Sequence, residues 1–330
     1  MSRDRDSRFG ASILRAFTRR IDASAIVATT VLFFAFSFGT HNFLTPFNQF
    51  NVWRAASQNV FIALGQAMVV IIGGMNLSLG AIGGLTVVII GHSIEVLGLN
   101  PAVAVILGLA TGALCGLFNG FFIARFKLNS FVVTLASSFI FQGLVNGISQ
   151  GRPYSRIPSG FTVLGKGDLF GVPNLLFLTV IALAIVYFVF RYTVFGRQLL
   201  ATGGNIEAAR MSGIKTGRMI ILANVLSGLF ASIAASLWVS RMGTAQPATG
   251  GDWLIVSFAV TVIGGTALSG GTISALGFLF SGLLMALVRN GLIMLGVNVY
   301  FESTFLGSII LLAVMVEYFR ARAAGRARKI

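Results

Sequence analysis

The stretch "ALGQAMVVIIGGMNLSLGAIGGL", Ala63 to Leu85, is apolar enough to enter a membrane as a helix, yet paired glycines and small polar residues interrupt its centre. Its middle part, "IGGMNLSLG" (Ile72 to Gly80), returns 191 residues later as "IGGTALSGG" (Ile263 to Gly271), with six of nine positions identical. Breaks of this kind are tolerated in a bilayer only where the freed backbone groups are buried in protein or line a wet cavity. We therefore expect broken or re-entrant helices, one in each half of the chain.

The composition is that of a membrane protein. The 330 residues are 56% hydrophobic and only 10% charged, with a mean hydropathy of +0.89. A soluble domain needs more surface charge, and apolar runs of the ~20 residues that cross a bilayer recur throughout the chain. We predict an all-α, polytopic transmembrane bundle of about ten spans. The expected spans are 24–40, 58–73, 80–97, 101–124, 129–149, 174–191, 219–240, 253–269, 272–288 and 301–319, and each pair that meets a repeated motif can instead be one broken element.

The basic residues indicate the orientation. With a cytoplasmic N-terminus, the cytoplasmic segments 1–23, 125–128, 191–218 and 320–330 hold 18 of the 24 Lys and Arg, as the positive-inside rule requires. We expect a permease domain at 24–319 in the bacterial inner membrane, with cytoplasmic basic tails at 1–23 and 320–330. The net charge of +15 then faces anionic lipid rather than nucleic acid. No small-residue cleavage site follows the first span, so we expect it to remain as an anchor.

Missing motifs limit the function. No "GxxxxGK[ST]" phosphate loop occurs, so the chain is not expected to hydrolyse ATP itself. A lone Cys115 and two distant histidines give no metal site, and we predict no catalytic residue and no cofactor of the chain's own. The nine acidic residues fall in loops, tails or near span ends. A gradient-driven transporter, which commonly carries an ionisable residue inside the membrane, is therefore the alternative rather than the first choice.

The cytoplasmic loop 192–218 predicts one short helix. Asn205 can cap it, Glu207 in its early turn complements the positive end of the helix dipole, and Gly213 is placed to end it. The helix is either a connector lying on the membrane or a docking element for a soluble partner.

The segment "TGGNIEAARMSGI", Thr202 to Ile214, resembles the coupling helix of membrane subunits of bacterial ABC importers. From about residue 50 to 319 the chain resembles the ribose-type sugar permease family. Ala63–Leu85 is similar to one signature, in which an Asp often stands at the position of Asn76. Ala259–Val297 is similar to the second. The resemblance implies a membrane pathway subunit without catalysis of its own.

That family resemblance also implies the partners. A second permease subunit, identical or related, completes the pathway, a cytoplasmic ABC ATPase uses ATP and Mg, and a periplasmic sugar-binding protein delivers a monosaccharide or similar small polar solute. A nucleoside, autoinducer or inositol stays open as the solute. The residues implied in ATPase coupling are Gly204, Asn205, Glu207, Ala208, Ala209 and Gly213.

The two repeated motifs supply the candidates for the solute pathway. Their polar atoms can contact a polyhydroxylated solute, or they can only satisfy the freed backbone and allow tight packing. The candidates are Gly73, Gly74, Asn76, Ser78, Gly264, Gly265, Thr266 and Ser269.

Two other patterns concern packing and docking. Glycines recur every four residues at 108–120 and again at 143–151, and we assign both ladders to close helix packing. The external loops 150–174 and 241–253 are the expected landing surface for the binding protein. Arg152, Arg156, Lys166 and Arg241 can meet acidic residues there, unless they are simply solvated loop charges.

Overall fold

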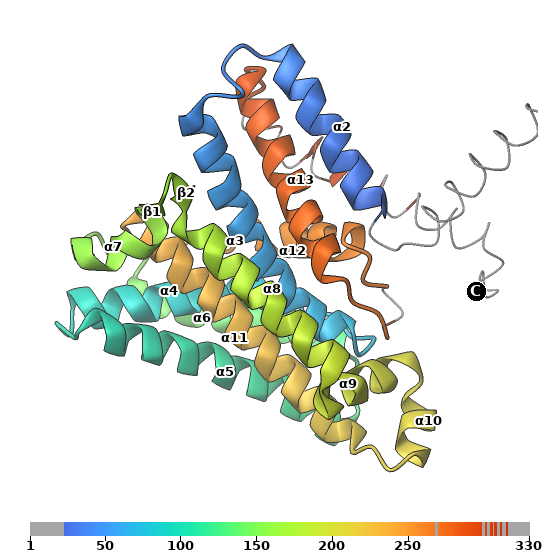
Figure 1. Ribbon diagram of the computed structural model, residues 1–330. Helices are drawn as coiled ribbons and strands as arrows, with labels where there is room; N and C mark the ends of the chain where they lie inside the picture. Colours follow the sequence, from blue (N-terminus) through green and yellow to red (C-terminus); the bar gives the residue numbers. More distant parts are fainter. Residues whose placement is uncertain are drawn as a thin grey trace, which may run out of the picture.

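The chain folds into a helical bundle, described in a computed structural model for residues 23–267, 270–298, 301, 304–305, 307–308, 311 and 315 (Figure 1). Its elements are α2 (Ala23–Gly39), α3 (Pro46–Val70), α4 (Leu79–Glu95), α5 (Pro101–Phe126), α6 (Ser130–Ser149), α7 (Ser159–Lys166), β1 (Asp168–Leu169), β2 (Val172–Pro173), α8 (Asn174–Tyr192), α9 (Val194–Gly204), α10 (Ile206–Met211), α11 (Thr216–Met242), α12 (Trp253–Ile263) and α13 (Ala275–Met294). The two strands form a small antiparallel hairpin. Figure 1 shows α7 and this hairpin at one end of the bundle, the α7 end, and α9 with α10 at the opposite end, the α10 end.

The polytopic helical membrane protein expected from the composition is confirmed. Five described helices, α5, α6, α8, α11 and α13, are long and apolar enough to cross a membrane, and α2, α4 and α12 are shorter apolar helices. Each of the nine spans predicted before residue 298 overlaps a helix. The tenth, 301–319, falls on positions of which the structure describes only a few, so the count of about ten stays a prediction.

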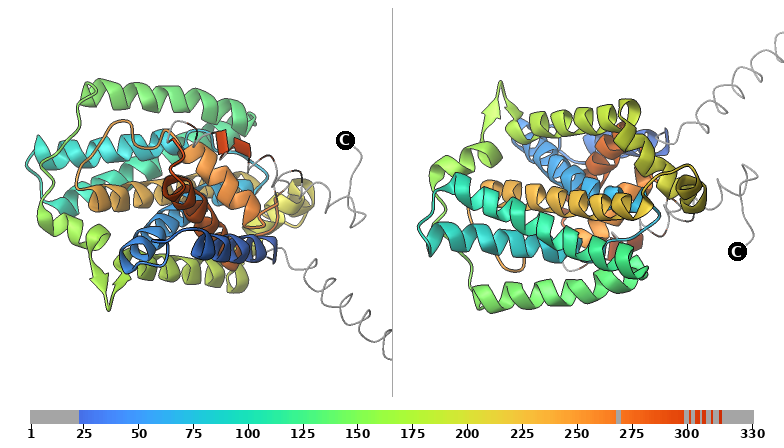
Figure 2. Two further views of the ribbon diagram at one scale, coloured as in Figure 1. Left: turned by 90° about the horizontal axis from the view of Figure 1, so that it is seen from above. Right: turned by 90° about the horizontal axis from the view of Figure 1, so that it is seen from below.

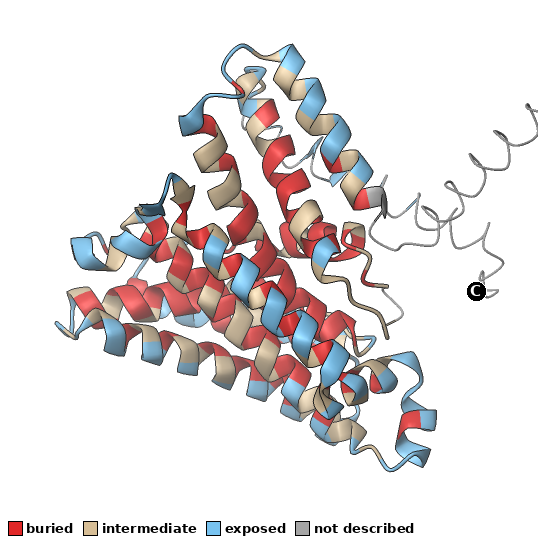
Figure 3. Ribbon diagram, viewed as in Figure 1, coloured by how far each residue is buried: buried red, intermediate tan, exposed pale blue. Residues whose placement is uncertain are grey.

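Burial separates central from peripheral helices (Figure 3). More than half of the apolar window is buried in α11 (56%) and α13 (61%), but only 28%, 22% and 28% in α5, α6 and α8. Figure 2 shows α6 at one edge of the bundle and α8 at the opposite edge. The peripheral helices therefore present most of their surface to lipid or to another protein chain.

The first glycine ladder packs as predicted. Gly108, Gly112, Gly116 and Gly120 lie along one face of α5. A methyl group on Gly112 would overlap the carbonyl oxygen of Gly228, and one on Gly116 would overlap that of Asn224, both in α11. The absence of side chains thus lets the backbones of α5 and α11 touch.

The second ladder does not pack within the chain. Gly143 and Gly147 of α6 are exposed, and a methyl group added to either one, or to Gly151 beyond the helix, would meet no atom of the described chain within 4 Å. The assignment of this ladder to packing is wrong for the single chain, because these residues lie on the outward face of a peripheral helix.

The connection from α11 to α12 packs against α4 although it is not helical. Residues 244–252 follow a glycine-rich face of α4. A methyl group placed on Gly91 would lie 2.6 Å from the Cβ of Ala245, and one on Gly84 would lie 2.8 Å from the carbonyl oxygen of Thr249. We call residues 244–252 the unwound segment.

The unwound segment reaches the middle of the bundle. Gly80, in the first turn of α4, touches the carbonyl of Gly250. Further along α4, Thr86 Oγ1 lies 3.0 Å from Oγ of Ser232, near the middle of the 27-residue α11. The prediction that 241–253 is an external loop is therefore wrong for Thr249 to Trp253, because the small residues Gly80, Gly83 and Gly84 of α4 leave room for this part of the chain.

The span predicted at 253–269 is also shorter than expected. α12 has 11 residues, about 16 Å at 1.5 Å per residue, or half of a ~30 Å bilayer core. The unwound segment supplies the other half of this crossing. The break expected in the second half of the chain, at Ile263 to Gly271, lies at the other end of α12, which stops at Ile263. The irregular entry before α12 was not predicted.

Candidate functional site

The predicted cytoplasmic helix is present as α10, and local chemistry explains its start. Asn205 has an extended backbone, and its Oδ1 accepts from the N–H groups of Glu207 (3.1 Å) and Ala208 (3.0 Å). These bonds satisfy two donors that have no partner inside the helix. The predicted cap is confirmed.

The end of α10 also matches the expectation. Gly213 has a φ of 81°, and the N–H of Ile214 donates to the carbonyl of Ala209 (3.1 Å), which is the Schellman arrangement. Glu207, Ala208 and Gly213 are exposed, whereas Ala209 is buried against its own chain. Of the predicted docking residues, the first three are therefore available to a partner.

A junction of three backbones connects α10 to both repeated motifs. The N–H of Gly271 donates to the carbonyl of Ile71 at 2.9 Å. Gly203, at the end of α9, packs so tightly here that a methyl group on it would overlap the oxygen of Ile71. A methyl group on Gly270 would lie 2.8 Å from that oxygen and 3.0 Å from the nitrogen of Gly73. We call Ile71, Gly73, Gly203, Gly270 and Gly271 the glycine junction.

Both broken helices end in the same way. In α3, Gly73 adopts a φ of 76°, and the N–H of Gly74 reaches back 3.0 Å to the carbonyl five residues earlier. In α12, Gly265 adopts a φ of 86°, and the N–H of Thr266 does the same over 3.1 Å. Each is a Schellman cap. The caps are displaced by one residue in the repeat, since Gly73 aligns with Gly264.

Asn76 is the centre of a buried hydrogen-bond network. Its Nδ2 donates to Oγ of Ser227 (2.9 Å), and its Oδ1 accepts from both the N–H and the hydroxyl of Ser78 (3.0 and 2.7 Å). Asn119 donates to Oγ of Ser78 (2.8 Å). When the oxygen and nitrogen of the Gln66 side-chain amide are exchanged, its nitrogen donates to the carbonyl of Asn76 (2.9 Å). Asn76 and Ser78 are fully buried, so in this conformation their side chains form hydrogen bonds only within the protein.

Side chains from α6 complete the support of this motif. Oγ of Ser130 accepts from the N–H of Met75 (3.1 Å), and Oγ1 of Thr134 accepts from that of Leu77 (3.0 Å). Backbone donors freed by the helix break are thereby satisfied, as buried donors must be. This is one of the two roles expected for the motif, and contact with a solute stays a prediction.

The second motif is packed more by backbone than by side chains. A methyl group on Gly264 would lie 3.2 Å from the carbonyl carbon of Gly277. Thr266 is fully buried, and its hydroxyl has no hydrogen-bond partner among the described residues. Ser269, the last predicted pathway residue, lies outside the described residues.

The sequence analysis missed two open polar faces. On α6, Gln142 and Asn146 directly precede the two outward glycines and are exposed. On the unwound segment, Gln246 is exposed as well. A signal was available for α6, since a polar amide stands before each glycine at the same four-residue spacing. None was available for the unwound segment, whose depth depends on contacts with α4.

The α7 end gathers basic residues that lie far apart in sequence. They are Arg54, Lys166, Arg241 and Arg289. Arg54 Nε donates to the carbonyl of Gly165 (3.0 Å). Arg241 is close enough to Arg54 and Arg289 for their positive charges to repel its own. One acid, Asp252, pairs with Arg289 at 3.0 Å. We call these five charged residues the basic cluster.

The two predicted landing segments meet at one point of the α7 end. Tyr154 and Ala245 pair through both backbone bonds, at 3.0 and 2.8 Å. Burial, followed by the charge of Glu95, raises the pKa of Tyr154 above its usual value. Arg156 is exposed, and its backbone N–H donates to Glu95 (2.8 Å).

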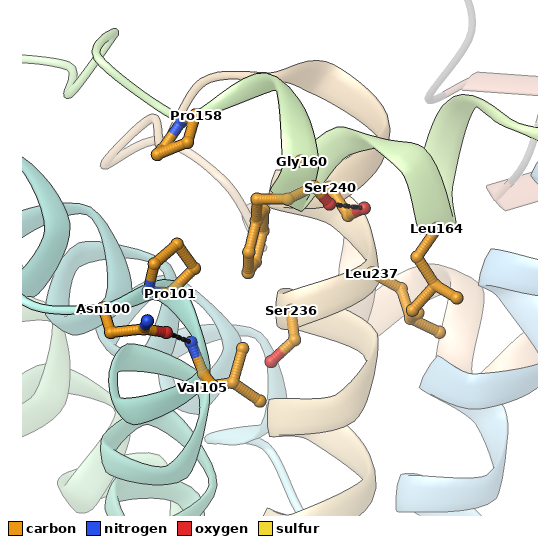
Figure 4. A pocket seen from close by; sticks show the side chains of 11 residues that line it. Asn100, Pro101, Val105, Pro158, Gly160, Leu164, Ser236, Leu237 and Ser240 are labelled. Atoms are coloured by element: carbon orange, nitrogen blue, oxygen red, sulfur yellow. Dashed lines mark hydrogen bonds between the residues drawn. The ribbon is translucent and has the colours of Figure 1, made fainter.

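A cavity of about 400 Å³ lies between α5, α7 and α11 (Figure 4). Its polar groups are already used: Asn100 caps α5, Ser240 donates to the carbonyl of Phe161 (2.6 Å), and Ser236 donates to the backbone of α11. Since the remaining lining is mostly apolar, this cavity lacks the free hydrogen-bonding groups that a polar solute needs.

Comparison with known proteins places this geometry in a family. Residues 48–316 match the family described as branched-chain amino acid transport system / permease component. The chain is 35% identical over 278 residues to the ribose import permease protein RbsC of Bacillus subtilis, covering 84% of this chain and 86% of that one. The chain belongs to the ribose-type permeases of the ABC importers.

Other relatives of this permease agree. It is 32% identical over 312 residues to RbsC of Escherichia coli K12, covering 92% of this chain and 96% of the relative. It is 34% identical over 302 residues to the L-arabinose transport system permease protein AraH of the same organism, covering 90% of each chain. No solved structure matches the chain at a significant level.

Proposed function

We propose that this permease forms the membrane pathway for a monosaccharide or similar small polar solute, driven by a cytoplasmic ABC ATPase. The observation that carries the proposal is α10, a capped and exposed helix. Gly203, three residues before α10 begins, contacts both repeated motifs in the glycine junction. The chain that leads from α10 back to Gly203 thus links a docked ATPase to both helix breaks. Glu207, Ala208 and Gly213 form the docking face, while Asn205 and Ala209 hold it in place. Gly204 is exposed, and a methyl group on it would meet no described atom within 4 Å.

In the membrane, the α10 end faces the cytoplasm. The distribution of 18 of 24 basic residues over the expected cytoplasmic segments supports this orientation. Ten spans, with the last at 301–319, leave both termini on the cytoplasmic side of the bacterial inner membrane. The α7 end then faces the periplasm.

The periplasmic binding protein docks at the α7 end in this proposal. The basic cluster carries four cations against one acid, and Arg152 and Arg156 lie on the adjacent loop. Acidic side chains on the binding protein complement such a surface and speed its association. Arg54 and Arg241 replaced together by alanine should weaken that association, most strongly at low salt.

A second permease chain, identical or related, covers the faces that the single chain leaves open. ATP and Mg are used by the partner ATPase, since this sequence has no phosphate loop. The solute class follows from the relatives, which are named for ribose and L-arabinose. The second candidate, a gradient-driven transporter, is disfavoured by the family membership.

Uptake energetics test the proposal. Cells that express the complete operon should accumulate a ¹⁴C-labelled monosaccharide in a manner that survives a protonophore but stops when the partner ATPase is inactivated at its phosphate-loop lysine. Uptake that collapses with the protonophore and ignores the ATPase mutation would establish the gradient-driven alternative instead.

A further inference from the structure

A second cavity, of about 410 Å³, lies between the last two turns of α8, the helix α9 and the chain that leads into α13. Its volume falls within the ~300–1,000 Å³ of small-molecule sites. Tyr187 and Arg191 line it and are exposed, so the cavity is at the surface of the bundle. Much of the remaining lining is apolar, including Phe190, Leu200 and Ile273. Among the described residues that line the cavity, Arg191 alone carries a charge.

The free polar groups of this cavity are hydrogen-bond donors. Within the described part of the chain, the guanidinium of Arg191 and the hydroxyl of Tyr187 make no hydrogen bond or ion pair. Oγ1 of Thr272 accepts from the N–H of Ala267 (3.0 Å), which leaves its own proton for a ligand. The helices α8 and α9 and the chain from 270 to 275 contain no Asp or Glu. An arginine fork beside two hydroxyls matches a phosphate group, whose oxygens accept hydrogen bonds and carry negative charge.

The length of α8 places the cavity at the membrane surface. Its 19 residues extend about 28 Å at 1.5 Å per residue, close to the ~30 Å hydrocarbon core. Arg191 stands in the last turn of α8, at the end of the bundle that also holds α9 and α10 (Figure 1). Arg191 therefore lies at headgroup depth, where basic residues attract anionic lipids.

An exposed ridge of α8 leads from the cavity toward the middle of the membrane. Val180, Ala184, Tyr187 and Arg191 are all exposed, and their spacing puts them on one face of the helix. Only 28% of the apolar window of α8 is buried, so this face is open to lipid. An acyl chain can follow the ridge from Tyr187 to Val180 while its phosphate lies at Arg191. A free phosphate ion would use the cavity alone, without the ridge.

We propose that this cavity binds an anionic phospholipid, with its phosphate held by Arg191, Tyr187 and Thr272 and an acyl chain lying along α8. Gly271 also lines the cavity, and its N–H donates to the carbonyl of Ile71 in the glycine junction. The bound lipid therefore packs against the second repeated motif and stabilises the junction. The site depends only on the membrane location of the chain, so it holds whether or not α10 docks an ATPase.

Lipid titration followed by native mass spectrometry tests the site. The permease, purified with the chains that accompany it and stripped of lipid in detergent, would be titrated with phosphatidylglycerol and, in parallel, with phosphatidylcholine, which has no net charge. We expect about fivefold tighter binding of phosphatidylglycerol, the effect of about one cation near a lipid surface. Arg191→Gln should abolish this preference, and Arg191→Lys should keep it. The matched control is Arg125→Gln, since Arg125 is also exposed in the last turn of a transmembrane helix, α5, but does not line this cavity.

Equal binding of the two lipids by the wild type would overturn the proposal, as would an unchanged preference in Arg191→Gln. Loss of the preference in Arg125→Gln as well would reduce the effect to general surface charge and contradict a specific site. Millimolar inorganic phosphate should not displace the lipid, because the ion lacks the contacts along α8. Displacement by phosphate would assign the cavity to a free anion instead of a lipid.

Hydrogen exchange separates a lipid bound at the junction from lipid that only surrounds the bundle. The N–H of Gly271 donates to the carbonyl of Ile71 (2.9 Å), so its exchange reports on opening of the glycine junction. Phosphatidylglycerol, added at about four times its Kd, should slow this exchange about fivefold in the wild type and leave it unchanged in Arg191→Gln. Wild-type exchange that does not respond to phosphatidylglycerol would overturn the contact between the lipid and the junction.

Discussion

The backbone N–H of Gly271 lies 2.9 Å from the carbonyl oxygen of Ile71, joining the second repeated motif to the end of the helix that carries the first. Gly203 fills the remaining space at this contact, one residue before Gly204 and two before the cap of α10. The repeat is thus more than a sequence similarity, because its two copies meet just before α10 begins. In the proposed coupling, a movement of α10 would act on both broken helices at this point.

The junction predicts a sharp difference between neighbouring glycines. Gly203→Ala would place a methyl group on the oxygen of Ile71, and overpacking of this kind costs about 1–3 kcal/mol. We expect about a tenfold loss of solute uptake, with ATP hydrolysis continuing in the purified complex. Gly204→Ala is the matched control, because a methyl group there meets no described atom within 4 Å. Equal uptake by the two variants would remove the junction from the mechanism.

The cap of α10 predicts a graded effect on ATPase binding. Asn205→Ala removes the acceptor for two backbone N–H groups, which destabilises a helix start by about 1 kcal/mol. We expect about fivefold weaker retention of the ATPase during purification, measured by quantitative mass spectrometry. Asn205→Asp keeps the capping oxygen and should retain the ATPase like the wild type. A wild-type result for Asn205→Ala would mean that the docking face does not depend on this cap.

The Asn76 network predicts a stability defect rather than a simple loss of contact. Asn76→Ala strands Ser227 and Ser78 in a fully buried site, and each unsatisfied group costs about 1–3 kcal/mol. The detergent-purified complex should unfold at a lower temperature, as measured by tryptophan fluorescence. Asn76→Asp, which in its protonated form both donates and accepts, should fall between the wild type and Asn76→Ala. An unchanged unfolding temperature combined with lost uptake would favour direct contact with the solute.

The two glycine ladders predict opposite folding outcomes. Gly112→Val would drive two methyl groups into the backbone of α11 at Gly228 and should abolish folded protein in the membrane. Gly143→Val faces open space and should yield normal amounts of folded single chain, measured by fluorescence-detected size exclusion. Similar yields from both variants would contradict the packing described for α5.

Sequence reasoning succeeded where the signal is local. The apolar runs placed nine helices, and Asn205 and Gly213 marked the start and end of α10, because capping depends on residues within one turn. It failed where the partner is distant. The ladders on α5 and α6 look alike in sequence, since four-residue spacing puts glycines on one face but says nothing of what lies across from it. The depth of Thr249 and Gly250 was hidden for the same reason, because it depends on their contacts with Gly84 and Gly80 of α4.

The most direct test of the central claim is to tag this permease in its native host, extract it gently and identify the chains that co-purify by mass spectrometry. The account predicts a chain with a phosphate loop in the wild-type sample, and its loss when Glu207 and Gly213 are both changed on α10. A well-folded wild-type permease that emerges without any ATPase would contradict the coupling role of α10 and the account built on it.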